Sequence, residues 1–276
     1  MLNEELLLSI SPEKRAREYV QTCEGLLNPN LFKVTHIPTT IEVSDVDDIP
    51  QSLVKLTTVY LYRALNFKAD HEDVFAIPLQ VADENSDDPD IPISKGWRDK
   101  ANEFLFQIKG LDDQSIVAAI RLTGFHSYYP DEEITLDKLI VGDKSVANIR
   151  QLVSRMAEFG SSVGLKHDPS EFVSIHWIRS VRILIPGVYS HFLDGDTFWK
   201  LTVFSPGEVL SKEETLELLI YYMFLSRARQ FSNWFSKVTK LGIFDARTNN
   251  TFVVNLSDIS QDVLKIVADQ VIVFNK

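Results

Sequence analysis

Hydrophobic residues recur at intervals of three and four along two stretches of the chain, which is the spacing of one buried helix face. The first stretch ends near residue 67, and its apolar residues are Leu53, Leu56, Tyr60, Ala64 and Phe67. The second ends at Gly164 and carries Val146, Ile149, Leu152, Val153, Met156 and Phe159. Both stretches are predicted to be amphipathic helices.

Helix-start signals predict two further helices. Ser11 is a good N-cap, and Pro12 follows it at a position where a missing N–H costs nothing. Ser211 and Glu214 have the spacing of a capping box, in which each residue satisfies a helix-end donor. The helix that starts there is expected to continue to about Lys237.

Short runs rich in β-branched and aromatic residues predict the strands. Single strands are expected at residues 39–43, 74–81, 134–141 and 172–177 and at the terminal residues 271–274. Two hairpins are expected: 103–109 with 115–122, and one within 242–255 that turns at Asn249-Asn250, because asparagine tolerates positive φ. Short helices are expected at 179–187 and 258–268.

This order of elements predicts an α+β fold with a mixed, largely antiparallel central sheet flanked by helices. We divide the chain into an N-terminal helical segment (1–38), a core (39–204) and a C-terminal helix and hairpin extension (205–276). Within the core, the acid-rich residues 83–90 with Pro89 and Pro92 predict an exposed loop.

Composition places the chain among globular proteins, with 276 residues, 45% hydrophobic residues and a net charge of −11. The longest apolar run, Leu218 to Leu225, is far shorter than the roughly 20 residues that span a bilayer. The first residues are acidic, unlike a secretory signal, and the single cysteine, Cys23, fits a reducing compartment. We therefore expect a cytoplasmic protein that binds no membrane.

We also expect no nucleic-acid partner, because binding nucleic acid needs lysines and arginines clustered on one face of the protein. The densest basic stretches, residues 14–17 and 227–229, are better explained as solvated helix faces.

A search for catalytic and metal-binding groups yields few candidates. The six histidines show no pair at helical ligand spacing, so no metal site is expected. His191 lies near Asp194 and Asp196 and is a possible general base. A nuclease of the carboxylate-and-lysine type would need an acid-x-lysine motif on a strand, and only Gln107-Ile-Lys109 approximates it.

Over about 160 residues from Thr39, the succession of elements resembles the GNAT family of N-acyltransferases. Within it the chain looks most like the acyl-homoserine-lactone synthases and N-acyl amino acid synthases. The segments that carry the resemblance are 41–49, 60–67, 83–90, a hairpin ending at Ile120-Arg121-Leu122, 135–141, the helix to Gly164, and 181–189.

The resemblance implies transfer of an acyl group from a thioester carrier to a small amine. In such folds two splayed strands, here 135–141 and 172–177, bind the pantetheine arm of acyl-coenzyme A or an acyl carrier protein. The N-terminus of the following helix faces the carrier's phosphates. No tightly bound cofactor is expected beyond this co-substrate.

The resemblance also assigns roles to individual residues. The donor would be bound by Gly142, Lys144, Ser145 and Arg150, the acceptor by Arg63 and Arg121, with Glu133 as base and Tyr189 as acid for the leaving thiol. Asp143 departs from the family's phosphate loop because it places a negative charge near the phosphates, and Lys144 and Arg150 compensate for it in part.

A different class of function fits the same sequence: a non-catalytic interaction protein, such as a subunit of a larger assembly or an acidic decoy for basic partners. The chain has four tryptophans, eight tyrosines and 17 phenylalanines, and Phe231, Trp234 and Phe235 close the long C-terminal helix. If such aromatic residues were exposed, they would mark a partner interface. Whether the chain is an enzyme, and its oligomeric state, stay open at this point.

Overall fold

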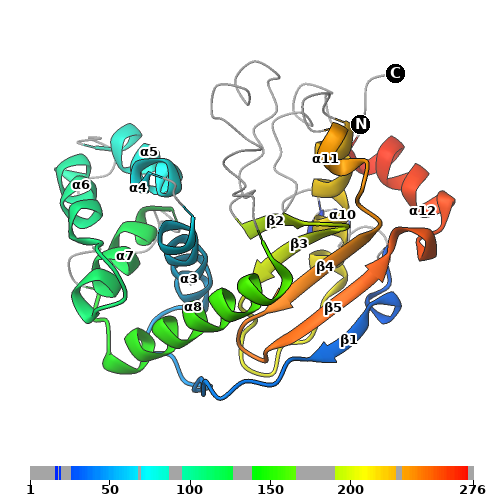
Figure 1. Ribbon diagram of the computed structural model, residues 1–276. Coiled ribbons are helices and arrows are strands. Elements are labelled where there is room, and N and C mark those ends of the chain that lie inside the picture. Colours follow the sequence, from blue (N-terminus) through cyan, green and yellow to red (C-terminus); the bar gives the residue numbers. More distant parts are fainter. Residues whose placement is uncertain are drawn as a thin grey trace. The chain divides into compact units, whose positions relative to one another are not determined.

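The computed structural model describes residues 16, 17, 19, 26–67, 70–86, 95–126, 139–165, 190–227 and 232–272 (Figure 1). The chain divides into two compact units. The sheet unit consists of residues 1–37, 163–202 and 207–276, and the helical unit consists of residues 38–162 and 203–206. The α+β class and the mixed, mostly antiparallel sheet predicted from the sequence are confirmed.

The sheet unit is built on a five-stranded sheet with the order β1-β5-β4-β3-β2. The strands are β1 (Lys33–His36), β2 (His191–Asp194), β3 (Thr197–Thr202), β4 (Lys240–Asp245) and β5 (Asn250–Asn255). All neighbours are antiparallel except β3 and β4, which are parallel and joined through helix α10 (Lys212–Arg227). A parallel connection needs such a crossover, whereas the antiparallel neighbours β2–β3 and β4–β5 need only short turns.

Two residues with positive φ make these turns possible. Asn249, with φ of 57°, ends the turn between β4 and β5, which confirms the hairpin predicted there. Gly195, with φ of 52°, turns the chain between β2 and β3. The Asp194-Gly195 pair between two hydrophobic runs is a strong hairpin signal, and this hairpin is an addition to the two predicted from the sequence.

Two smaller groups of elements complete the sheet unit. Before the sheet lies η1 (Pro29–Leu31), and Ala16, Arg17 and Tyr19 are the described residues of the predicted first helix, all helical. After α10 come α11 (Ser232–Phe235), η7 (Leu256–Asp258), α12 (Gln261–Ile266) and the π-helix η8 (Val267–Ile272). The helix predicted for 211–237 is thus described as α10 and α11, with residues 228–231 outside the described part. The terminal strand is wrong for residues 271 and 272, which are helical.

The helical unit contains α3 (Gln51–Asn66), α4 (His71–Val74), α5 (Ala76–Glu84), α6 (Trp97–Gln107), α7 (Asp113–His126) and α8 (Asp143–Val163). Helices α3 and α8 confirm the two amphipathic helices predicted from the hydrophobic spacing. Gly164, with φ of 75°, ends α8 in the left-handed conformation that glycine adopts at little cost. No helix in the described ranges is long and apolar enough to cross a membrane.

Three strands predicted in this unit are wrong, because the segments are helices. Residues 74–81 form parts of α4 and α5, and the predicted hairpin 103–122 forms parts of α6 and α7. In α6 the buried residues Trp97, Ala101 and Phe104 follow helical spacing, whereas Phe106, which a strand would bury with Phe104, is 76% exposed. Helix α7 starts where the Asp112 carboxylate accepts a hydrogen bond from the Ser115 backbone N–H, at 3.0 Å.

The strand predicted at residues 39–43 is also wrong: none of residues 37–50 is in a strand, and side chains of α8 bind the backbone of residues 41–46. The Asn148 side chain accepts from Ser44 N (2.9 Å) and donates to the carbonyl oxygens of Ser44 and Val46 (both 3.1 Å). Arg155 donates to the carbonyl oxygen of Ile41 at 3.0 Å. Of the predicted strand 134–141, residues 139–141 are described and form no strand, while residues 134–138 and the predicted elements 172–177 and 179–187 lie outside the described residues.

Close packing of Trp199 on Gly242 yields a first prediction. The two residues are register partners on β3 and β4, and a Cβ at position 242 would overlap the indole ring. We expect Gly242→Ala to lower the free energy of unfolding by about 1–3 kcal/mol, because an overpacked core must shift. Equilibrium urea unfolding measures this. Gly110→Ala is the matched control, since only Asp112 lies near its added methyl group, at 3.9 Å. Equal effects of the two substitutions would contradict the packing argument.

Candidate functional site

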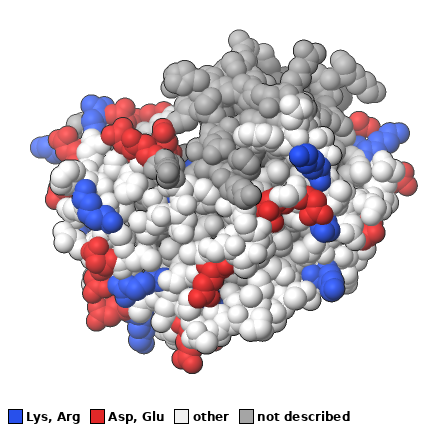
Figure 2. Space-filling model, in the orientation of Figure 1, with Lys and Arg blue, Asp and Glu red and all other residues white. Residues whose placement is uncertain are grey.

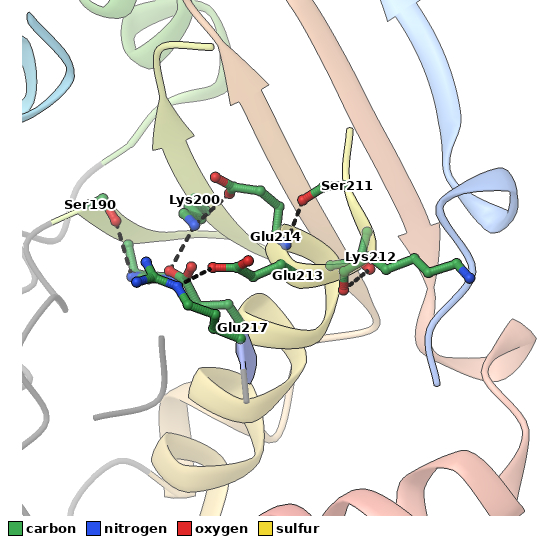
Figure 3. Close-up of polar contacts among 10 residues, drawn as sticks. Ser190, Lys200, Ser211, Lys212, Glu213, Glu214 and Glu217 are labelled. Atoms are coloured by element: carbon green, nitrogen blue, oxygen red, sulfur yellow. Dashed lines mark hydrogen bonds and ion pairs between the residues drawn. The ribbon is translucent and has the colours of Figure 1, made fainter. Parts of the chain in front are cut away.

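The sheet unit buries a group of charged side chains between β3 and α10. The side chain of Lys200 is 2% exposed, and its Nζ lies 2.6 Å from Glu214 Oε2 and 2.7 Å from Glu217 Oε1. Figure 3 shows the ammonium pointing at both carboxylates, which project from the same helix. We call Lys200, Glu214 and Glu217 the lysine cluster.

The local sequence explains why these side chains meet. Side chains alternate along β3, so Lys200 lies on the same face as Phe198, two residues before it. Phe198 contacts Tyr222 of α10 with ring centroids 6.4 Å apart, so this is the face that α10 covers. Glu214 and Glu217 are three residues apart and therefore share one helix face. The Ser211 hydroxyl accepts from the Glu214 backbone N–H at 3.1 Å and fixes the start of the helix, which is one half of the predicted capping box, while the Glu214 carboxylate binds Lys200.

The charge of Lys200 is set by two opposing effects. Burial by itself lowers the pKa of Lys200, but the carboxylates of Glu214 and Glu217 outweigh it and raise this pKa above its ordinary value. The raised pKa favours the ammonium form of Lys200 at neutral pH, in which it serves as the counter-ion of the two carboxylates.

His191 lies next to the lysine cluster, because it is the register partner of Lys200 on β2. Its side chain is buried between two rings, with centroids 5.3 Å from Phe198 and 4.2 Å from Tyr221. The Ser190 hydroxyl lies 3.4 Å from its Nδ1. This imidazole is packed as a core residue.

The grouping of His191 with two aspartates, suggested by the sequence, is not formed as expected. Asp194 is three residues from His191 on the same strand and so lies on the opposite face. Asp196 is in the turn and binds Lys240, Thr197 and Thr239. The Lys240 hydrogen bond, with the others, lowers the pKa of Asp196. Asp196 is thus used in the turn, and Asp194 lies on the face of β2 opposite to the imidazole.

The residues predicted to bind an acyl donor lie at the start of α8. A Cβ at Gly142 would overlap the Asp48 side chain, and the Ser145 hydroxyl accepts from Asp48 N at 2.6 Å. The Asp48 carboxylate thus lies against the first turn of α8. Lys144 is exposed there.

Arg150 lies further along α8 and binds the chain at the start of α7. It donates to the carbonyl oxygen of Leu111 at 2.8 Å and pairs with Asp113. The structure therefore brings Gly142 and Ser145 together against Asp48 and uses Arg150 to hold a different loop.

The other predicted site residues are divided between helices and segments outside the described part. Arg63 is buried on α3, and the Arg121 guanidinium on α7 lies 5.9 Å from the ring centroid of Phe104. Glu133 and Tyr189 lie outside the described residues.

The nuclease motif suggested at Gln107 and Lys109 has no strand to support it, because Gln107 is the last residue of α6. Within the part of the chain that the structure describes, no group of three His, Cys, Asp or Glu side chains could hold a metal ion.

Sequence reasoning missed the lysine cluster although signals for it exist. Lys200 interrupts the apolar run of β3, and Glu217 interrupts the apolar run of α10. A lone charge at a buried position of each element indicates that the two charges pair, because an unpaired buried charge is costly. The partners cannot be matched without knowing that α10 covers this face of the sheet.

Comparison with known proteins adds no relative. No family model matches the chain, and neither the curated proteins nor the solved structures include a significant match.

The lysine cluster yields a second prediction. Lys200→Met leaves the carboxylates of Glu214 and Glu217, whose side chains are 12% and 10% exposed, without their ammonium, and we expect a loss of about 3–5 kcal/mol in the free energy of unfolding. Adding Glu214→Gln and Glu217→Gln to Lys200→Met is expected to recover most of the lost free energy of unfolding, because none of the three positions then carries an unpaired charge. Urea unfolding of the full chain at pH 7 measures both effects.

The control is Lys240→Met on the neighbouring strand. Lys240 pairs with Asp196 at 2.9 Å, and the two side chains are 40% and 49% exposed. Exposed pairs contribute at most about 1 kcal/mol. A loss in Lys200→Met no larger than that in Lys240→Met would refute the role given to the cluster.

Proposed function

We propose that this protein is a non-catalytic interaction subunit of a larger assembly. The observation that carries this proposal is the lysine cluster, in which the buried ammonium is bound by the carboxylates of buried Glu217 and half-buried Glu214. Groups held in this way stabilise a scaffold and are not presented to a substrate. His191 beside them is packed between rings in the same manner.

The start of α8 supports the same proposal. An acyl-coenzyme A donor would place its phosphates at this helix end, where the Asp48 carboxylate now lies. A carboxylate there uses the positive end of the helix dipole and repels phosphate. N-acyl transfer, with Glu133 as base and Tyr189 as acid, stays a prediction that the first experiment below tests directly.

The charge of the chain indicates the chemistry of the partner. The net charge is −11, and Figure 2 shows exposed carboxylates gathered over α4 and α5, where Glu72, Asp73, Asp83 and Glu84 are exposed. An acidic protein associates faster and more tightly with a surface that carries lysine and arginine. The proposal therefore includes a protein partner with a basic contact face.

The third prediction concerns the acyl donor. Thermal unfolding of the full chain is expected to be unchanged by acetyl-, decanoyl- or palmitoyl-coenzyme A, with the free fatty acids as controls. A donor at about 100 times its dissociation constant would add roughly 2.7 kcal/mol of stability, which is easily detected. Stabilisation by one chain length that is lost in Lys144→Ala would overturn the proposal in favour of acyl transfer. Lys144 is the suitable variant because it is exposed, whereas Arg150 holds the loop before α7.

The fourth prediction concerns the assembly. When the chain is produced at its natural level in its own cells, native mass spectrometry is expected to find it in a complex of fixed stoichiometry, heavier than its own 31.5 kDa. We expect this complex to dissociate between about 50 and 500 mM NaCl, because salt screens contacts between oppositely charged surfaces. A chain that is found alone at 50 mM NaCl would contradict the proposed function.

A further inference from the structure

The strand β1 forms one edge of the five-stranded sheet, and its side chains are open to solvent. Figure 1 shows it beyond β5, at the end of the order β1-β5-β4-β3-β2. All four residues of β1 are exposed, and Val34 is 56% exposed. At the other edge, the first three residues of β2 are buried. An exposed edge strand is a template for a further strand, because its outer backbone groups have no neighbour in the sheet.

The register with β5 identifies the backbone groups of β1 that point outward. The Ile37 N–H donates to the Asn249 carbonyl oxygen at 2.9 Å, so these two residues form a hydrogen-bonded pair. Such pairs alternate along an antiparallel ladder, so residues 33 and 35 also direct their backbone groups to β5. The N–H and C=O groups of Val34 and His36 therefore point away from β5. No hydrogen bond to these four groups comes from the described residues.

These outward groups are complementary to a second copy of β1. If Thr35 lies on a twofold axis between two antiparallel copies, Val34 of each copy is opposite His36 of the other. Each outward N–H then meets a carbonyl oxygen, and the two strands exchange four hydrogen bonds. The two Thr35 side chains face each other, and Lys33 is opposite Ile37, so no like charges meet.

The neighbouring registers lose hydrogen bonds. With His36 on the axis, Val34 would be opposite Pro38, which has no N–H to donate. With Val34 on the axis, His36 would need the Phe32 N–H, which already donates to the Pro29 carbonyl oxygen at 3.0 Å. The edge thus specifies one pairing with a copy of itself.

The charge around β1 also fits a second copy. The chain has 39 aspartates and glutamates, yet residues 25–41, which contain β1, have none, and neither do residues 246–257, which contain β5. Two copies of this acidic chain can therefore approach each other here without opposing carboxylates. A basic partner finds no carboxylate on these two strands.

We propose that β1 is a dimerisation edge through which two copies of this chain join their sheets into one continuous sheet. The pairing is antiparallel and centred on Thr35. It is independent of the function proposed above, because the basic partner proposed there binds carboxylates that β1 and β5 lack.

Sedimentation equilibrium of the purified full chain tests the fifth prediction. We expect a species of twice 31.5 kDa to form as the protein concentration rises to about 500 µM, because a small interface associates weakly. Its dissociation constant is expected to fall between about 50 and 500 mM NaCl, since salt screens the repulsion between two copies of charge −11. The complex with a basic partner dissociates over the same range of salt, so the two proposals fail separately.

Val34→Pro removes an outward N–H and none that binds β5, which is the position where an edge strand tolerates proline. Two of the four hydrogen bonds between the copies are lost, and we expect the dissociation constant to rise at least about 10-fold. Val34→Thr is the matched control, because it keeps the N–H and the β-branched side chain. It is expected to dimerise like the unaltered chain.

A disulfide tests the register without depending on proline. In Cys23→Ser, Thr35→Cys places two cysteines opposite each other in a non-hydrogen-bonded pair, with Cα atoms about 4.5 Å apart, which a disulfide can bridge. Mild oxidation is expected to give a covalent dimer on a non-reducing gel. Lys33→Cys in the same background is the control, because its two cysteines would be about 14 Å apart along the strands.

Three results would overturn the dimerisation edge. One is a chain that stays at 31.5 kDa at about 500 µM in 500 mM NaCl. The second is a dimer with the same dissociation constant in Val34→Pro and Val34→Thr. The third is equal disulfide formation at positions 33 and 35, which also decides the matter if Val34→Pro does not fold.

Discussion

The buried pairing of Lys200 with Glu214 and Glu217 is the constraint on which the sheet unit depends. An ammonium in an apolar interior is tolerated only with its counter-ions, so β3 can present only one face to α10. A slip of one residue along the strand would turn Lys200 to the other face and leave three charges unpaired. The pairing therefore also fixes where Phe198 and, through the register, His191 lie.

Sequence patterns correctly predicted the elements in which only one kind of hydrophobic spacing, that of a helix or that of a strand, is present. Helices α3 and α8 bury residues at intervals of three and four, and the turn at Asn249 needs the positive φ that asparagine tolerates. The α6 region contains two competing patterns. Phe104, Phe106 and Ile108 alternate as in a strand, while Trp97, Ala101, Phe104 and Ile108 follow a helix. Only the exposure of Phe106 decides between them.

The candidate site was less predictable than the fold, because its members are brought together by tertiary contacts. Lys200 and Glu217 are 17 residues apart and belong to different elements. The segment 39–43 has the composition of a strand, yet the Arg155 side chain of α8 binds the carbonyl oxygen of Ile41, and Asn148 binds the backbone of Ser44 just beyond the segment. Local composition cannot reveal a backbone partner that comes from a side chain about 100 residues away.

The division into two units has a consequence for the order of folding. Helices α3 to α8 lie within one continuous stretch, so their contacts become possible as soon as that stretch has left the ribosome. Strand β1 pairs with β5, and Lys33 must wait for Val253, 220 residues later in the chain. Until then the edge of β5 does not exist, and closing so long a loop is slow. The N-terminal strand is thus made early but is among the last to be placed.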